Sequence, residues 1–352
     1  MARLDIHFDD VDDRMAKKMI AYVDDDNNES RTGTLDLPRD DGEPWGLDDS
    51  EVSRVVHLVA YQIGRLADSV PIDHFSNSTL PSAFLDAKEE LKQLLGIVFG
   101  DDIEKKSKAV FTETMDSKAL ATLHASLFRA LFSAAVQQWV FYSRISDIPS
   151  IKAVSFDVQQ KVILAKYGFS TLRNIHRATW VSLMYENPEQ IRHVFTSEAA
   201  DLTNRFLTTL EPLIVPVDES KHTPAIDDWI SSTRDGQPGH RVVLQIFTAS
   251  LKLKARLPLT EQYYEFLSPV LGTSFSRDLM AVDGEDVMDM DIADDSISQF
   301  SIMPAIIEYP MSVFITETED EAALFGPHNF VRATATEREK GRVVCPAILT
   351  LQ

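Results

Sequence analysis

This sequence contains a single cysteine, Cys345, among 352 residues. One cysteine cannot form a disulfide within the chain, and it cannot build a cysteine-rich zinc site. Cys345 lies in the run "RVVCPAIL", which has the composition of an apolar strand, and a thiol in such a run is most often an inert core residue. We therefore expect neither a disulfide framework nor a cysteine nucleophile.

Glycine is also scarce, with 13 residues, and neither of the glycine-rich phosphate loops, G-x-x-x-x-G-K-[ST] and G-x-G-x-x-G, occurs in the sequence. The 9 histidines include no pair at i, i+3 or i, i+4, so a helical metal-binding pair is absent, and we expect His124 and His176 to be core or boundary residues. The segment "YGFSTL" (167–172) lacks the G-x-S-x-G nucleophile elbow. From these patterns we predict no catalytic residue, no metal and no cofactor.

Basic residues are few: 34 Lys and Arg stand against 55 Asp and Glu, which gives a net charge of −21. Phosphate binding needs a basic face, so we do not expect nucleic acid as a direct partner. The most apolar run, "ALFSAAVQQWVF" (130–141), contains two glutamines and is too short to span a bilayer. The first residues, "MARLDIHFDDVDDRM", have acids where a signal peptide needs an apolar core. We predict no membrane partner and a cytoplasmic or nuclear location.

The acidic residues are concentrated in two segments of the chain. Residues 1–50 hold 15 Asp and Glu against 6 Lys and Arg, and residues 281–300 hold 7 acids and no base. The rest of the chain is nearly balanced, and 44% of all residues are hydrophobic, which is enough to bury a sizeable core. We therefore expect a folded body with solvated acidic flanks, since like charges repel one another.

Apolar residues recur with helical spacing over much of the body. The predicted helices cover about 50–66, 82–98, 117–142, 156–185, 189–210 and 239–257, with a small amphipathic one at 10–23. From Leu127 onward the helix at 117–142 is apolar around nearly its whole circumference, which is typical of a buried central helix. Leu127, Leu131 and Trp139 should therefore be almost inaccessible to solvent.

Beyond Pro258 the pattern changes to short β-rich runs bounded by proline and glycine, at 263–269, 301–310 and 342–351. The predicted fold class is mainly α: a helical bundle with an acidic irregular N-terminal arm and a small mixed α/β C-terminal cap. The predicted domains are an acidic, mostly irregular arm (1–48), a helical body (49–258), and a mixed cap (259–352) with short strands and an acidic loop at 283–296.

Several segments resemble, in this order along the chain, a large family of uncharacterised filamentous-fungal proteins: "LFRALFSAAVQQWVF", "LKLKARLPLTEQYYEFLSPVLGTSF", "IMPAIIEYP" and "NFVRATATEREKGRVV". The resemblance covers roughly residues 80–352. It implies a fungal origin, an acidic leader before a helical region and a charged element near the end. It implies no activity, because these segments carry no catalytic signature. Here "FVR" follows "GPHN", where the family has a basic or cysteine-containing lead.

The acidic segment "DVMDMDIADDS" (286–296) has three interpretations: a calcium loop, a docking strip for a basic partner, or a solvated connector. An EF-hand loop needs glycine at its sixth position and glutamate at its twelfth. Counting from Asp286 or from Asp289 places an aspartate at the sixth position and an apolar residue at the twelfth, so the calcium loop is unsupported. The connector is favoured, and docking remains open because alternating acids and apolar residues are typical of interaction segments.

Two sets of residues are candidates for partner binding: the acidic strip of Asp286, Met288, Asp289, Met290 and Asp291, and the basic cluster "LKLKARL" with Lys252, Lys254 and Arg256. On a helix the three bases of this cluster spread widely around the axis, which favours long stems lying around an exposed helix end over a phosphate site. A second basic group alternates with glutamates and reads as a solvated helical face, at Arg332, Arg338, Lys340 and Arg342.

The function that these patterns favour is a non-catalytic interaction or scaffold protein. Its helical body would dock another protein, and its acidic flanks would tune the association. The alternative is an enzyme whose site is assembled from scattered residues that no linear motif reveals. A concave site with converging Asp, Glu or His would favour the enzyme, and a broad exposed face would favour docking.

Overall fold

The computed structural model describes residues 49–69, 84, 87–111, 117–143, 188–213, 239–257, 262–282, 296–310, 313 and 330–351. The predicted acidic arm, residues 1–48, and the predicted helices at 10–23 and 156–185 lie outside the described residues. Most of the predicted acidic loop at 283–296 lies outside them as well.

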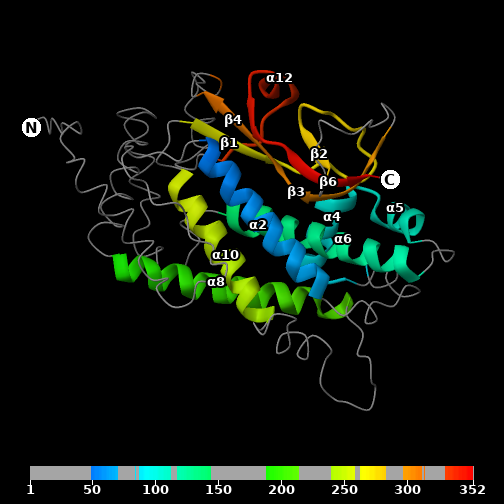
Figure 1. Ribbon diagram of the computed structural model, residues 1–352, viewed down its shortest axis with the longest axis horizontal. Helices are drawn as coiled ribbons and strands as arrows, with labels where there is room; N and C mark the ends of the chain where they lie inside the picture. The colour runs from blue at the N-terminus through cyan, green and yellow to red at the C-terminus, as the bar shows by residue number, and fades with distance from the viewer. Residues whose placement is uncertain are drawn as a thin grey trace, which may run out of the picture.

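Four helices of the described residues, α2, α6, α8 and α10, form a layer on one side of the strands, and α12 lies on the other side (Figure 1). The described helices are α2 (Asp49–Ser69), α4 (Glu89–Phe99), α5 (Ile103–Val110), α6 (Ser117–Ala135), α8 (Pro188–Leu210), α10 (Gly239–Arg256) and the short α12 (Ala335–Arg338). The helices predicted at 50–66, 117–142, 189–210 and 239–257 are confirmed to within a few residues at most ends. α8 begins at a proline, which suits the first turn of a helix because its missing N–H has no partner there.

The α6 helix continues without a break into a π-helical turn, η4 (Val136–Phe141), and a 3₁₀ turn, η7 (Glu211–Leu213), follows α8. As predicted, the end of α6 is deeply buried: Leu127, Leu131 and Trp139 are 0%, 1% and 5% exposed. A π-helical turn holds one more residue than an α-helical turn, and it often marks a position where side chains are aimed at a particular neighbour.

Six strands are described: β1 (Gln262–Leu267), β2 (Met280–Val282), β3 (Ser298–Met303), β4 (Ala305–Pro310), β5 (Arg342–Cys345) and β6 (Ala347–Leu351). They form two three-stranded sheets, ordered β1-β4-β5 and β2-β6-β3. Two runs of the chain pass from one sheet to the other, and each contains a proline at the crossing. Pro304 lies between β3 and β4, and Pro346 lies between β5 and β6. Proline has no N–H for a strand ladder, so each run divides into two strands at this residue.

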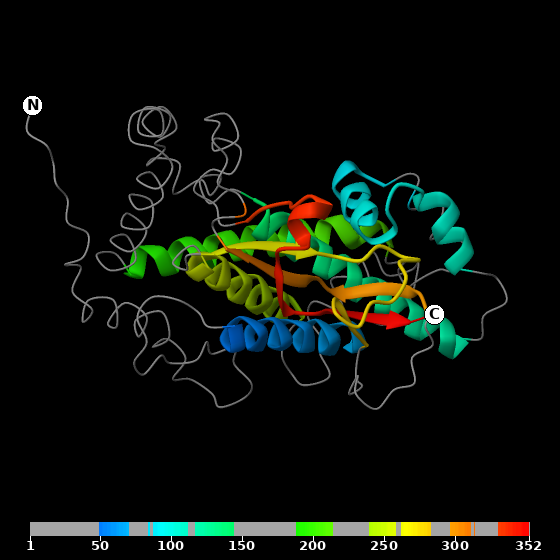
Figure 2. The same ribbon diagram turned by 90° about the horizontal axis from the view of Figure 1, so that it is seen from above.

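The predicted fold class, a mainly α helical bundle with a small mixed cap, is wrong, whereas the acidic irregular arm predicted with it lies outside the described residues. The β-rich runs form two sheets instead of a cap, and the sheets share one hydrophobic core with the helices. Seen from above, α2 lies along one side of the strands and α4 along the other (Figure 2). The described residues therefore form an α+β arrangement, in which a helical layer and a strand layer bury their apolar faces against each other.

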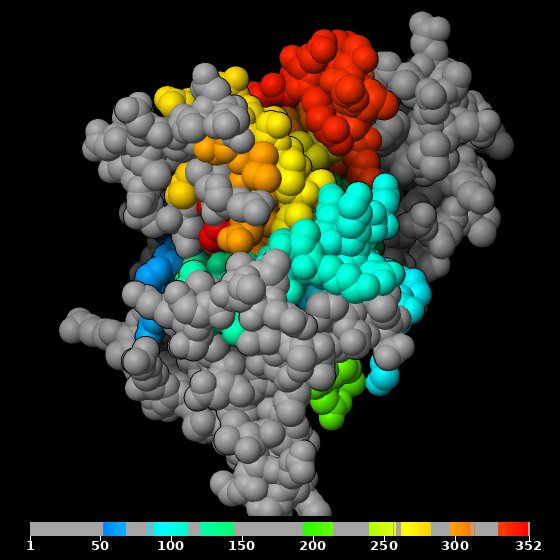
Figure 3. Space-filling model, turned by 90° about the vertical axis from the view of Figure 1, so that its right-hand side faces the viewer, coloured from blue at the N-terminus to red at the C-terminus, as the bar shows by residue number. Residues whose placement is uncertain are grey.

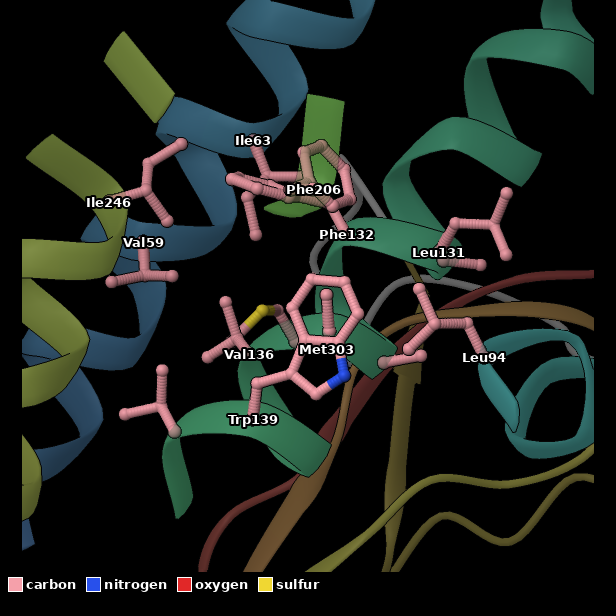
Figure 4. Packing of buried hydrophobic residues seen from close by; sticks show 14 of the residues in the cluster. Val59, Ile63, Leu94, Leu131, Phe132, Val136, Trp139, Phe206, Ile246 and Met303 are labelled. Carbon is pink, nitrogen blue, oxygen red and sulfur yellow. The ribbon is translucent and has the colours of Figure 1, made fainter. Parts of the chain in front are cut away.

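The shared core is visible where β3 meets the π-helical turn. Figure 4 shows Met303 of β3 beside Val136 and Trp139, with Phe132 and Leu131 of α6 close by. The core cluster also takes side chains from four strands: Phe266, Phe300, Met303, Ile306 and Cys345. The strands thus contribute directly to the packing around α6.

The opposite end of the strand layer is tied to α4 and α5. Leu271 N–H donates to the carbonyl of Val98, and the Lys106 ammonium donates to the carbonyl of Leu271 at 3.1 Å. Figure 3 shows this side of the molecule, with the yellow residues of the chain between β1 and β2 beside the cyan residues of α4 and α5. These contacts fix the segment that leads from one sheet into the other.

His124 in α6 is 1% exposed and stacks on Phe111, with ring centroids 5.9 Å apart. Burial lowers the pKa of His124 from 6.5 to about 4, so the native protein holds the neutral imidazole near pH 5 while the unfolded chain binds a proton. Because the unfolded state binds more protons between about pH 6.5 and pH 4, this group makes stability fall as the pH falls through that window.

We expect His124 to remove about 2 kcal/mol of stability between pH 7 and pH 4.5, since each pKa unit corresponds to about 1.4 kcal/mol. Urea denaturation of the wild type and of His124→Leu at several pH values measures this effect. The difference between the two proteins isolates His124 from the other titrating groups. A difference in unfolding free energy that does not change with pH would contradict the prediction.

Candidate functional site

The predicted acidic strip, Asp286, Met288, Asp289, Met290 and Asp291, lies outside the described residues, but the strands before and after it are described. The described chain stops at the end of β2 and resumes at Ser296, just before β3. β2 pairs in parallel with β6 on one side, and β3 pairs antiparallel with β6 on the other. Val282 pairs with Leu349 and Ser298 with Leu351, so the described residues that flank the acidic segment lie beside the C-terminal half of β6.

The structure does not bring Lys252, Lys254 and Arg256 together on one surface. Lys254 is 2% exposed, whereas Lys252 is half-buried, and the side chain of Arg256 lies outside the described part. The Lys254 ammonium donates to the carbonyl of Val140 and to the carbonyl and hydroxyl oxygens of Ser143, the last two at 2.5 and 2.9 Å. This differs from the exposed stems that the sequence suggested.

Lys254 instead has a structural role at the end of η4. The last carbonyls of a helix have no partner within the helix and carry partial negative charge, so a buried cation is well placed there. The Lys254 ammonium therefore links α10 to the end of η4. It is engaged by these oxygens rather than presented to a partner.

A second buried charge, Glu265 of β1, is 2% exposed and lies among polar groups from three segments. Its Oε2 accepts from the Tyr309 hydroxyl at 2.7 Å and from Arg338 Nε at 3.0 Å. Its Oε1 accepts from Arg338 Nη2 at 2.7 Å and from the Ala333 N–H at 3.2 Å. We call Glu265, Tyr309, Ala333 and Arg338 the Glu265 cluster.

The protonation states of the Glu265 cluster suit a fixed ion pair. Burial, and then the hydrogen bond to Glu265, raise the pKa of Tyr309, so its hydroxyl stays neutral and donates. The hydrogen bonds to Glu265 also raise the pKa of Arg338, so its guanidinium stays charged. A carboxylate has about four lone-pair sites, and here four donor groups occupy them. The Glu265 carboxylate is therefore fully occupied by donors within the protein.

Glycine is required beside this cluster, at Gly341 after α12. A Cβ added there would lie 2.5 Å from Cγ2 of Ile307 and 2.6 Å from Cε1 of Tyr309. The turn thus lies directly on β4, which brings Arg338 over the sheet. Within the described residues α12 has only four residues, and Arg338 and Arg342 pair with strand carboxylates, Glu265 and Glu308. The four basic residues are exposed, as predicted, but only Arg338 lies in a helix, so the helical part of that prediction is wrong.

Side chains from η4 and from Tyr142, the residue directly after it, contact the outer edge of β1. The carbonyl of Phe266 accepts from Gln137 Nε2 at 2.6 Å and from the Tyr142 hydroxyl at 2.9 Å. Burial raises the pKa of Tyr142, so the hydroxyl keeps its proton. Further along the same edge, the carbonyl of Tyr264 accepts from the N–H of Val331. Unpaired strand edges can pair with other chains, and these contacts give the outward carbonyls of Tyr264 and Phe266 partners within the protein.

Cys345 and His57 approach each other but do not form a nucleophile and base. Cys345 Sγ lies 4.0 Å from His57 Nδ1. The same Nδ1 lies 2.7 Å from the carbonyl oxygen of Ser53, which can only accept, and this assigns the hydrogen to Nδ1. Burial raises the pKa of the Cys345 thiol to about 11, so it stays protonated near neutral pH. The pair agrees with the expected inert core thiol.

A small cavity lies between the helices and the strands, lined by residues such as Val56, Val136, Phe141, Phe266 and Met303. It encloses about 10 Å³ of free space, about the room that one water molecule needs. Its wall is apolar except for Ser250. This cavity is a packing defect of the core and is too small for an organic ligand.

The outer face of α2 is the best candidate for an interaction site. Arg54, His57, Tyr61 and Arg65 are exposed along it, and we call these four residues the α2 face. Tyr61 is 62% exposed, and the Arg65 guanidinium carbon lies 6.0 Å from the centroid of its ring. The opposite side of the helix is anchored in the core, because Val52, Val55, Val59 and Ile63 are at most 2% exposed.

No family model matches this chain, and no curated protein or solved structure matches it either. The resemblance to fungal proteins therefore stays a prediction. Among the helices that the structure describes, none combines the length and the hydropathy needed to cross a bilayer. In the same residues, no group of His, Cys, Asp or Glu is arranged to hold a metal ion.

Proposed function

We propose that this chain is a non-catalytic interaction protein, whose helical layer docks another protein through the α2 face and whose acidic flanks tune the association. The observation that carries the proposal is the composition and exposure of that face. Tyrosine and arginine are enriched in protein interfaces and in their energetic hot spots. Tyr61 is a large, exposed aromatic ring between two arginines on the same helix.

The rigidity of α2 supports this role. Interaction side chains bind best when their backbone is held by packing, because little conformational freedom is then lost on binding. The inner face of α2 contacts α6, α10 and β5, so the α2 face is presented on a fixed helix. The basic character of the α2 face favours an acidic protein partner. We place the protein in the cytoplasm or the nucleus, on the basis of its sequence.

The buried polar groups support a non-catalytic role. Glu265 and Lys254, the most buried charged groups of the described residues, are each engaged by several hydrogen-bond partners from other segments. In both cases the contacts join structural elements that are far apart in sequence. The hydrogen bonds of Glu265 and Lys254 therefore hold helices and strands together.

The test is affinity purification with the full-length protein, comparing the wild type with Tyr61→Ser/Arg65→Ser. We expect the wild type to retain specific protein partners that the double variant loses. Val270→Ser is the matched control, since Val270 is also exposed, at 37%, but lies in the segment between β1 and β2. Exposed substitutions change stability by about 0.5 kcal/mol or less, so melting temperatures should stay close. Identical partner sets for all three proteins would refute the proposal.

A further inference from the structure

The α2 face is basic, although the chain as a whole is strongly acidic. From Arg54 to Arg65 the exposed positions of α2 are two arginines, a histidine and a tyrosine, and none is an acid. At 100° per residue these four positions lie within an arc of about 80°. They therefore form one narrow stripe along the helix, which suits an extended acidic segment lying along it.

The chain contains such a segment next to α2. Residues 1–48 carry 14 Asp and Glu against 6 Lys and Arg, and residue 48 directly precedes Asp49, the first residue of α2. A chain of 48 residues can span at most about 160 Å, and α2 is about 30 Å long. Residues 1–48 are therefore long enough to reach every residue of the α2 face.

We propose that the acidic arm, residues 1–48, binds the α2 face of its own chain and competes there with the protein partner. The competition rests on the proposed function, whereas the contact itself does not. A tether of this kind gives an effective concentration on the order of millimolar. A weak contact is then sufficient to occupy the site, and a partner with better complementarity can displace it.

The forces available fit a weak and reversible contact. Exposed ion pairs contribute about 0–1 kcal/mol each, so the two arginines alone give a small gain. The exposed ring of Tyr61 adds an apolar surface for side chains of the arm. Such an association depends on salt, because exposed charges are screened within about 8 Å at physiological ionic strength and within about 3 Å at 1 M.

The experiment places a photo-reactive benzoylphenylalanine at position 61 of the full-length chain. After irradiation at low micromolar concentration, peptide mapping identifies the cross-linked segment. We expect cross-links to residues 1–48, falling by about fivefold or more at 1 M salt. The same fall is expected when Arg54→Glu and Arg65→Glu are added. The same probe at position 270 should give no cross-link to residues 1–48, because Val270 lies beside Gly100 at the end of α4, across the strands from α2.

Mixing isotopically heavy and light protein separates contacts within a chain from contacts between chains. Cross-links that join heavy to light peptides would overturn the proposal in favour of association between copies. Cross-links confined to residues 283–295, or no cross-link above the level at position 270, would also overturn it. These outcomes leave the proposed function untouched if partner capture still requires Tyr61 and Arg65. Conversely, arm cross-links without any partner that depends on the α2 face would refute only the proposed function.

Discussion

Replacing Glu265 with alanine should lower the free energy of unfolding by about 3–5 kcal/mol, the cost typical of removing one partner from a buried ion pair. Glu265 is 2% exposed and accepts hydrogen bonds from Tyr309, Ala333 and Arg338. Without the carboxylate, the buried Tyr309 hydroxyl and the Ala333 N–H lose their acceptor. Arg338 loses its partner over the sheet at the same time. Urea denaturation measures the loss.

Two further variants separate charge from shape. Glu265→Gln keeps an acceptor oxygen for Tyr309 but removes the charge, so it should cost less than alanine. Arg338→Met keeps much of the arginine stem, and its side chain is already 38% exposed, so we expect about 1–2 kcal/mol. A double-mutant cycle with Glu265→Gln and Arg338→Met gives the coupling energy. A loss below about 1 kcal/mol for Glu265→Ala would show that the Glu265 cluster does not hold α12 on the sheet.

The helices could be predicted from the sequence because their signal is local. Apolar residues at helical spacing in α2, α6 and α10, and a proline at the start of α8, specify these helices without knowledge of the rest of the chain. The burial of Leu127, Leu131 and Trp139 followed from the same pattern. Their positions around the axis left no polar face to turn toward solvent.

The strand layer was underestimated because its evidence is not local. The runs "SIMPAIIEYP" and "RVVCPAILTL" each looked like one short strand, but the proline inside each run divides it between two sheets. Six short strands then pair across large sequence separations, for example β1 with β4 and β2 with β6. No periodicity in one segment reveals such pairing, so a second layer was mistaken for a cap.

The candidate site was predicted less well than the fold. Lys254 looked like one of three exposed bases, and its burial depends on carbonyls of η4, more than 100 residues earlier in the chain. Glu265 had a signal that could have been used: one acid among the aromatic residues of "QYYEFL" suggests a buried carboxylate with a cationic partner. The α2 face was also readable, since Arg54, His57, Tyr61 and Arg65 fall on the polar side of a helix whose apolar side was recognised.

Replacing Phe132 with alanine should also cost about 3–5 kcal/mol, the range for removing a fully buried aromatic side chain. Phe132 of α6 is 0% exposed. Its ring centroid lies 4.3 Å from that of Phe206 in α8 and 5.3 Å from that of Phe247 in α10. One side chain therefore joins three helices, and its loss leaves a cavity where they meet. Urea denaturation with an unchanged slope would show that the variant loses stability and not its two-state unfolding.

The matched variants for this prediction are Phe132→Leu and Tyr61→Ala. Leucine refills most of the cavity, so Phe132→Leu should lose clearly less than alanine, about 1–2 kcal/mol. Tyr61→Ala removes an aromatic ring of similar size from the exposed α2 face and should change stability by about 0.5 kcal/mol or less. If Phe132→Ala lost no more than Tyr61→Ala, the ring would not lie at a common junction of α6, α8 and α10. Among the aromatic residues of α6 in the described part of the chain, Phe132 alone contacts both Phe206 and Phe247. That result would therefore contradict the packing of α6 against α8 and α10.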